Sequence, residues 1–509
     1  MNNNEAFNLK KEITFLILIF IISRLIYIYY IGIEFDSWTL KIYWQFFPEH
    51  LLRQNLIESL FYNPYQPPFL NFITGIALKV SNNYYLLYIR LFYLISGLMS
   101  FILFFKTLIE IEMKRKISLY ITIGLMILPT TILYENHFYK DYLTMCFLTY
   151  TVYFSIKIIK NSSNNFNYIF FSISIVLLTL LREIFHIFWI YIFLLFLLKI
   201  NKEYKRIMIS FLTISIFVLP FYLKNFFLYN KFGINLSMYE NLSQKIEYVK
   251  QMQINNQHSK IKKIFFKNDD DFNKFTLSMS KIYYTPLNSL PSDYNKIINY
   301  KYGHTNSLTS NENYFNEIYI EVDEYRKDDF RKFIKEYPGL ILISTSNSLF
   351  RHFFRSSDTF YFTRFNADKM QTLIKISHCI KITLACFYEF PFVKEKFQIN
   401  EKFFFKINDN NFTYLDKIKF SLNDTNFILV LLYIMLTFFF FKSLLRRQNT
   451  KVNKLINFWV LSFLFIFFVL ICFEDGEIPR HRFPFDYLSL IFLIYYGKYF
   501  LDKKKNNFL

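Results

Sequence analysis

The sequence predicts an all-α polytopic membrane protein of about ten transmembrane helices, with about ten to twelve as the range. The chain has 509 residues, of which 53% are hydrophobic and 22% aromatic. Its apolar residues stand in long unbroken runs, and a run of about 18 such residues crosses the hydrocarbon core of a bilayer as a helix. A helix satisfies its own backbone hydrogen bonds in lipid, so these runs are predicted to be spans.

The runs divide the chain into three parts. An N-terminal transmembrane module covers 1–227 and includes a first outer loop at 34–83. A mixed and amphipathic extracytoplasmic region follows at 228–425, between the seventh and eighth spans, and a C-terminal transmembrane module covers 426–509. Spans are expected near 13–31, 85–105, 117–134, 142–159, 166–181, 184–200, 207–227, 427–445, 455–473 and 487–501.

Basic residues mark every second loop between these spans. Lys10 and Lys11 precede the first span, Lys114-Arg115-Lys116 follow the second, and Lys503-Lys504-Lys505 follow the last. Because Lys and Arg accumulate in cytoplasmic loops, both termini are expected in the cytoplasm. The same loops account for the net charge of +20, so no nucleic-acid partner is expected.

Two stretches of the long outer region, 333–354 and 370–390, alternate apolar and basic residues at near-helical spacing. They are predicted to be amphipathic helices on the membrane face, because Lys375, His378 and Lys381 oppose a second crossing. Cys379 and Cys386 are seven residues apart and could share a helical face, but could not bond within that helix. With Cys146 and Cys472 in or beside spans, no disulfide framework or zinc site is predicted.

The first outer loop carries carboxylates directly after the first span and a proline-rich turn further on. Glu34 and Asp36 flank Phe35, and either could act on a substrate at the membrane surface. The prolines fix the angle at which the chain re-enters the membrane, and this turn is the predicted rim of a pocket. Its residues are Tyr62, Tyr65, Gln66, Pro67 and Pro68. The alternative is a solvated helix end with aromatic anchors at the interface.

The second outer loop packs Glu135, His137, Lys140 and Asp141 into one short turn. Carboxylates with a histidine can hold a divalent cation such as Mg or Mn, and a cation can neutralise a phosphate. Glu135, His137 and Asp141 are therefore candidate metal ligands. A charged turn that keeps water at a helix end explains the same residues equally well.

The third outer cluster is Arg182-Glu183, which is either part of the pocket rim or a salt bridge in a helix turn. Arg24 lies within the first span and Arg90 near the outer end of the second. Arginine is costly in lipid, so each is expected to face the interior of the bundle, with snorkelling as the alternative for Arg90.

The last outer loop breaks the charge rule because Arg480, His481 and Arg482 lie outside. Guanidinium groups bind phosphate oxygens in a bidentate fork, so this loop is well placed to hold a lipid-linked phosphate. The alternative is a plain charge cluster neutralised by Glu474 and Asp475.

Together these features resemble the GT-C superfamily of membrane glycosyltransferases, in the branch of protein O-mannosyltransferases and lipid A aminoarabinose transferases. The resemblance runs from the first span to the last. Its pieces are Glu34 and Asp36, the turn from Tyr62 to Pro68, Arg90, Lys224-Asn225, the Phe333–Gly339 stretch and the Arg480–Pro484 turn. Family members often carry a basic residue where this chain has Gln66, which moves the expected phosphate contacts to Arg480 and Arg482.

The resemblance implies an inverting hexosyl- or pentosyltransferase whose catalytic part is the N-terminal module. Its donor would be a sugar on a polyprenyl phosphate in the membrane, and its acceptor a glycolipid, a polysaccharide or a protein. Asp36 would be the base, with Glu34 as the alternative, and Arg90 and His481 would join Arg480 and Arg482 at the donor phosphate. The expected location is a bacterial inner membrane with the active site facing the periplasm. A polysaccharide polymerase or ligase and a flippase or transporter of lipid-linked sugars are the competing functions.

Overall fold

The computed structural model describes residues 3–42, 46–47, 49–63, 66–236, 327, 330–331, 334–335, 338–354, 364–382, 426–445, 450–473 and 478–506. Within these ranges the chain is helical and forms no strand. Six helices are long and apolar enough to cross a membrane, which indicates the expected multi-pass membrane protein. They are α1 (Asn3–Leu25) continued by the π-helix η1 (Ile26–Tyr30), α6 (Tyr85–Glu110), α9 (Lys140–Lys160), α12 (Tyr204–Tyr229), α24 (Phe427–Leu445) and α25 (Lys451–Phe473).

Three of the predicted spans have a different form. The run at 117–134 is broken into α7 (Arg115–Met126) and α8 (Pro129–Glu135), which are bent by 58° and would add a seventh span if taken as one. Pro129 stands at the start of α8, where its missing N–H costs nothing. The runs at 166–181 and 184–200 form α10 (Asn165–Leu181) and α11 (Ile187–Asn201), which are 17 and 15 residues long and short for a crossing.

The remaining helices fill the loops and the C-terminus. The apolar run at 487–501 lies within α26 (Ile478–Asn506), whose ends are charged and which is not among the six spans. The first outer loop is itself largely helical. Its helices are α2 (Trp38–Ile42), α3 (Glu49–Gln54), α4 (Leu56–Tyr62) and the apolar α5 (Phe69–Val80).

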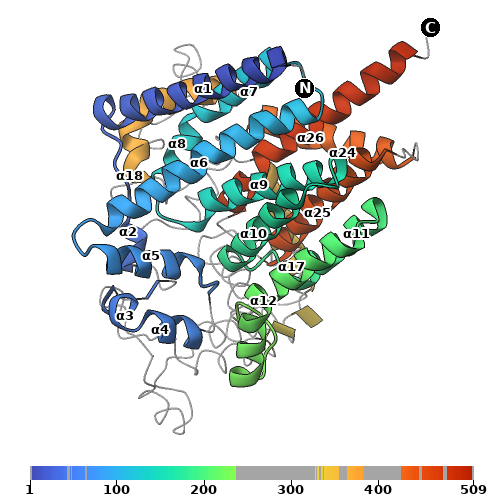
Figure 1. Cartoon of the computed structure of the whole chain (residues 1–509). Helices are drawn as coiled ribbons and strands as arrows, with labels where there is room; N and C mark the ends of the chain where they lie inside the picture. The colour runs from blue at the N-terminus through green and yellow to red at the C-terminus, as the bar shows by residue number, and fades with distance from the viewer. Residues whose placement is uncertain are drawn as a thin grey trace, which may run out of the picture.

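Helix α9 is the centre of the bundle. It packs against α6, α10, α25 and α26, which run side by side with it in Figure 1. Gly97 of α6 allows a close approach, since a Cβ there would lie 1.9 Å from the hydroxyl of Tyr142 on α9. The core is rich in aromatic rings, and Trp459 of α25 donates from its indole to Ser155 of α9 at 3.1 Å. These contacts hold α9 in the bundle and thereby fix the position of its first turn, which carries Asp141.

The two stretches predicted as surface helices contact other helices of the protein. Helix α17 (Pro338–Phe354) lies against α24, α25 and α26, and its His352 is fully buried. The second stretch forms α18 (Arg364–Ala367), the 3-10 turn η6 (Asp368–Met370) and α19 (Gln371–Ile380), and α19 packs on α8. Leu342 and Leu349 of α17 and Ile376 and Ile380 of α19 are nevertheless exposed. The place of these helices on the membrane face stays a prediction.

Cys379 at the end of α19 is disulfide-bonded, whereas Cys146 and Cys472 carry thiols. The prediction of no disulfide is therefore wrong. It assumed a helix that continues to residue 390, but α19 ends at Ile380 and Ile382 has a φ of +51°. A left-handed residue turns the chain away from the helix axis, which removes the geometric objection.

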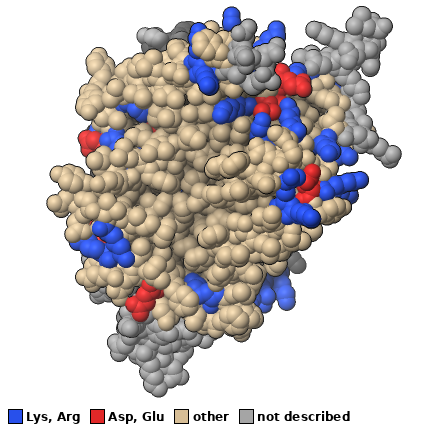
Figure 2. All heavy atoms as spheres, in the orientation of Figure 1, with Lys and Arg blue, Asp and Glu red and all other residues tan. Residues whose placement is uncertain are grey.

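On the face that Figure 2 shows, charged side chains lie toward the edges and the middle has almost none. Figure 2 shows Lys and Arg side chains gathered toward the upper right, the side on which both termini lie in Figure 1. Outward apolar side chains such as Leu18 and Ile21 of α1 and Leu91 and Ile95 of α6 are exposed, as expected of lipid-facing helices. The side with both termini is called the basic end below.

Candidate functional site

Asp36 is joined to the loop between α8 and α9 by backbone hydrogen bonds. Its N–H donates to the carbonyl of Asn136 at 2.7 Å, and the N–H of Phe138 donates to its carbonyl at 2.8 Å. This parallel bridge sets Asp36 opposite His137. Thr39 adds a third tie, since its hydroxyl donates to the carbonyl of Phe138 at 2.6 Å. The first and second predicted outer loops are thus one structural unit.

The side chains of Asp36 and His137 meet at this bridge. His137 Nδ1 lies 3.3 Å from Asp36 Oδ2, and the backbone N–H of Trp38 donates to Asp36 Oδ1 at 3.1 Å. Asp36 is only 7% exposed. A buried carboxylate beside an imidazole is a common arrangement for moving a proton.

Glu34 has different surroundings, although it is only two residues away. Its side chain is 68% exposed and lies 2.8 Å from the ammonium of Lys369. Its backbone N–H and carbonyl both bond the side-chain amide of Asn366. Glu34 therefore fastens the η6 segment to the end of the first helix. Of the two carboxylates, Asp36 is the better placed for proton transfer, because it is buried beside an imidazole.

Asp141 lies between two arginines in the interior. Arg182 Nη1 is 2.8 Å from Asp141 Oδ1, and Arg480 Nε is 3.3 Å from Asp141 Oδ2. All three side chains are at most 3% exposed. Two guanidinium groups share one carboxylate, so the cluster carries a net positive charge. Arg182 Nη2 is buried and, within the described part of the chain, has no hydrogen-bond partner.

The loop between α8 and α9 connects the Asp36–His137 pair to the Arg182–Asp141–Arg480 cluster. The ring of Tyr139 lies 6.3 Å from the ring of His137, and the guanidinium of Arg480 stands over the same tyrosine ring at 4.3 Å. The hydroxyl of Tyr93 holds this loop by donating to the carbonyl of Tyr139 at 2.7 Å. Asp36 and Arg480 therefore both contact the short segment that carries His137 and Asp141.

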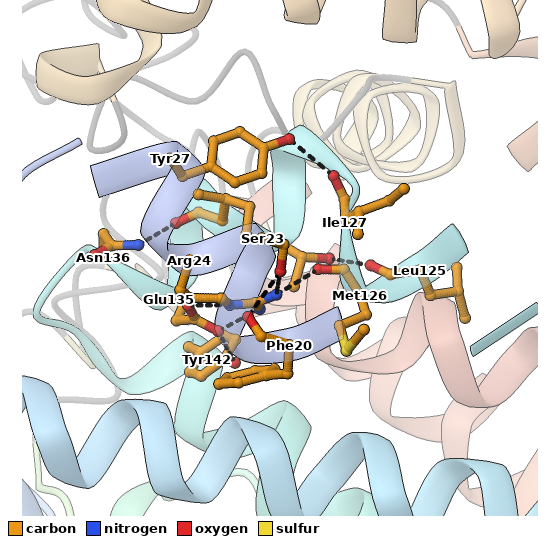
Figure 3. Close-up of polar contacts among 12 residues, drawn as sticks. Phe20, Ser23, Arg24, Tyr27, Leu125, Met126, Ile127, Glu135, Asn136 and Tyr142 are labelled. Carbon is orange, nitrogen blue, oxygen red and sulfur yellow. Dashed lines mark hydrogen bonds and ion pairs between the residues drawn. The ribbon is translucent and has the colours of Figure 1, made fainter. Parts of the chain in front are cut away.

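Glu135 has a separate environment. It accepts from Arg24 at 2.8 and 2.6 Å and from the hydroxyl of Tyr142 at 2.6 Å. Figure 3 shows Arg24 reaching across from the first helix, with a further bond to the carbonyl of Met126 at the end of α7. Both side chains are buried, as expected for an arginine that faces the bundle interior. Glu135 is therefore part of an ion pair that joins α1 to the end of α8, and Arg24 also binds the end of α7.

The three candidate metal ligands do not come together. Glu135 pairs with Arg24, Asp141 with two arginines, and His137 with Asp36. Among the described residues no three His, Cys, Asp or Glu side chains form a group that could hold a metal ion. The predicted Mg or Mn site at Glu135, His137 and Asp141 does not fit this geometry, because each of the three side chains has a different partner.

Arg90 and Arg482 make contacts other than those predicted. Arg90 donates to the side-chain carbonyl of Asn136 at 3.1 Å and to the carbonyl of Ile33 at 3.4 Å, so it holds the two joined loops. Arg482 donates to Asp486 and to the carbonyl of His352. His481 Nε2 lies 3.4 Å from Arg480 Nη2. Of the predicted phosphate ligands, Arg480 and His481 stay near the Asp141 cluster, and Arg482 turns toward α17.

The rest of the predicted rim has two parts. Glu183 pairs with Lys140 at 3.2 Å; its burial opposes ionisation, but the ammonium of Lys140 lowers the pKa of this carboxyl below its usual value. In the proline-rich turn, Gln66, Pro67 and Pro68 are buried and lead into α5, and Tyr62 precedes them at the end of α4. Tyr65 lies outside the described residues.

Two side chains were not recognised as site residues from the sequence. Tyr139, the aromatic surface under Arg480, has no distinctive signal in a chain this rich in tyrosine. Lys224 of α12 is 8% exposed and donates to the carbonyl of Asn63 in the proline-rich turn at 2.6 Å. A lysine inside an apolar run is such a signal, because it is costly in lipid without a partner. It brings a basic group to the turn where Gln66 stands.

No family model, no curated protein and no solved structure matches this chain.

Proposed function

We propose that the protein is an inverting glycosyltransferase that moves a sugar from a polyprenyl-phosphate donor to a glycolipid, polysaccharide or protein acceptor. The observation that carries the proposal is the gathering of the Asp36–His137 pair and the Arg182–Asp141–Arg480 cluster on one segment. A transfer of this kind needs a base for the acceptor and positive charge for the leaving phosphate.

The reaction would proceed in one displacement. Asp36, oriented by His137, takes the proton from the acceptor hydroxyl, and the acceptor oxygen bonds to the anomeric carbon. The bond between that carbon and the phosphate oxygen breaks, and the polyprenyl phosphate leaves with the electron pair. Arg480 and Arg182 stabilise its charge, and the unpartnered Nη2 of Arg182 is a donor for one phosphate oxygen. A single displacement inverts the anomeric configuration.

The proposed membrane topology has both termini in the cytoplasm of a bacterial inner membrane and the Asp36 site on the periplasmic side. The count of basic loops supports it. The disulfide at Cys379 supports it independently, because disulfides persist in oxidising compartments. Lys369, ten residues before Cys379, bonds Glu34, which places this segment at the Asp36 end of the bundle. Ten spans remain the proposal, with α10, α11, α26 and the bent pair added to the six.

The test is release of polyprenyl phosphate from a panel of polyprenyl-phosphate sugars by membranes that contain the protein. Asp36→Asn should fold normally and lower the rate by at least about a hundredfold, as expected for a lost general base. Asp368→Asn is the matched control, since Asp368 is an exposed acid of the adjoining η6 segment. Full activity of Asp36→Asn would remove the assignment.

A lipid-linked sugar transporter is the second candidate, because the buried Arg24–Glu135 pair lies beside the break between α7 and α8. Broken helices and buried ionisable residues are features of transporters. Movement of a lipid-linked sugar across proteoliposomes without any acceptor would favour this function. It would also be insensitive to Asp36→Asn, whereas transfer would not.

A further inference from the structure

A second group of charged side chains lines a cavity of about 240 Å³ at the basic end, at the opposite end of α6 from the first outer loop. Its walls include Glu110 at the end of α6, Glu112 just after it, Lys160 at the end of α9, Thr450 before α25, and Lys498 and Tyr499 of α26. Three of these helices are candidate spans, and the cavity lies where each of them ends. It therefore lies at the level of the lipid head groups rather than of the hydrocarbon core.

The charges on the wall are balanced. Lys498 Nζ lies 2.9 Å from Glu112 Oε2, and Lys160 Nζ lies 3.5 Å from Glu110 Oε2. Lys157, beside the cavity, adds a contact with Glu110 at 2.9 Å. A phosphate alone would meet the two carboxylates, and a cation alone would meet the ammonium groups. The wall is complementary to a ligand that carries both charges and has hydrogen-bond donors for the carboxylates.

Glu112 is held in an unusual conformation. Its φ is +65°, which a residue with a Cβ adopts at a cost, and Lys498 fixes it by donating to its carbonyl at 3.0 Å. Its side chain remains 76% exposed. The hydrogen bond from Lys498 and its charge lower the pKa of Glu112, so the carboxylate stays negative and open to a second donor.

We propose that this cavity binds the phosphoethanolamine head group of a membrane phospholipid. The ammonium group of the lipid pairs with Glu112, and its phosphate pairs with Lys498 and Lys160. The hydroxyl of Tyr499 is a further donor for the phosphate. Polar pockets between the ends of membrane helices are known places for head-group recognition. The lipid ties α26 to α9 and to the turn after α6.

Phosphatidylcholine is the matched ligand control, because it has the same charges as phosphatidylethanolamine but no N–H groups. The full chain is purified into detergent, mixed with equal amounts of the two lipids, and the retained lipid is counted by native mass spectrometry. The wild-type protein should retain phosphatidylethanolamine over phosphatidylcholine by about fivefold or more, the effect of about one hydrogen bond. Glu112→Gln should bring the ratio close to one, and Lys498→Gln should lower retention of both lipids.

Lys205→Gln is the control variant, since Lys205 is an exposed lysine of the same end that does not line the cavity. It should keep the wild-type ratio. Equal retention of the two lipids by the wild-type protein, or an unchanged ratio in a folded Glu112→Gln, would overturn the proposal. Soluble phosphoethanolamine that binds as tightly as the lipid would overturn the assignment to a lipid, because the acyl chains would then contribute nothing.

Discussion

Asp36 and His137 stand opposite each other in a single parallel bridge, and their side chains meet at 3.3 Å. The bridge joins the segment after the first helix to the loop before α9, about a hundred residues later in the chain. Because the backbone bonds fix both residues, the imidazole can orient the carboxylate without help from the substrate. The separate roles of the Asp36 carboxylate and the His137 imidazole can therefore be tested directly.

Replacements of His137 should separate a positioning role from a role as the base. An asparagine places an N–H near the position of Nδ1, so His137→Asn should keep a substantial part of the transfer rate. His137→Leu removes the contact and should lower the rate by about tenfold to a hundredfold, the range found for groups that orient a reacting residue. Release of polyprenyl phosphate is the measurement. Equal and complete loss in both variants would instead make His137 the base.

Arg480 and Arg182 should act on the donor rather than on the acceptor. Arg480→Gln removes one guanidinium but leaves Asp141 paired with Arg182, so the protein should remain folded. Charge-assisted bonds of this kind contribute about 1.5–3 kcal/mol, so the donor KM should rise by roughly tenfold to a hundredfold. Arg53→Gln, in the first outer loop, is the control and should have no effect. An unchanged donor KM in Arg480→Gln would contradict phosphate binding there.

The sequence located the helices better than it located the partners within the site. Long apolar runs predicted most helices within a few residues, because burial in lipid leaves a strong signal in composition. The partner of a side chain depends on the direction in which that side chain points, and amino-acid composition does not determine this direction. Arg480 and Arg482 belong to one short sequence motif, but residues two positions apart in a helix differ by about 200° in direction. Arg480 therefore meets Asp141, whereas Arg482 meets Asp486.

Side-chain direction also explains why Glu135 and Asp141 have different partners. They belong to one short charged loop, so the sequence predicted one metal site. Glu135 is the last residue of α8, and Asp141 lies in the first turn of α9. The two helix ends direct their side chains to Arg24 and to Arg182, on different sides of the loop. Ligand sets of this kind need the path of the backbone, which residue types do not determine.

The Arg24–Glu135 pair should be required for stability and not for the chemistry. Arg24→Met leaves a buried carboxylate without its charge partner and should lower the free energy of unfolding by about 3 kcal/mol or more. The double variant Arg24→Met, Glu135→Gln should recover part of this loss, because no unpaired charge remains. Thermal unfolding in detergent measures both. If the double variant is no more stable than Arg24→Met, the pair is not coupled as its geometry indicates.

The disulfide at Cys379 gives a prediction about both structure and sidedness. Of the four cysteines, Cys146 and Cys472 carry thiols, so a thiol reagent should modify two residues in the denatured chain before reduction and four after it. Cys379→Ser should free its partner and raise the first number to three. The bond should form in cells with an oxidising periplasm and be absent after expression in a strain that lacks disulfide oxidation, since it closes only on that side of the membrane. Four reactive thiols before reduction would contradict the bond, and a bond that forms without periplasmic oxidation would place α19 and the Asp36 site on the wrong side.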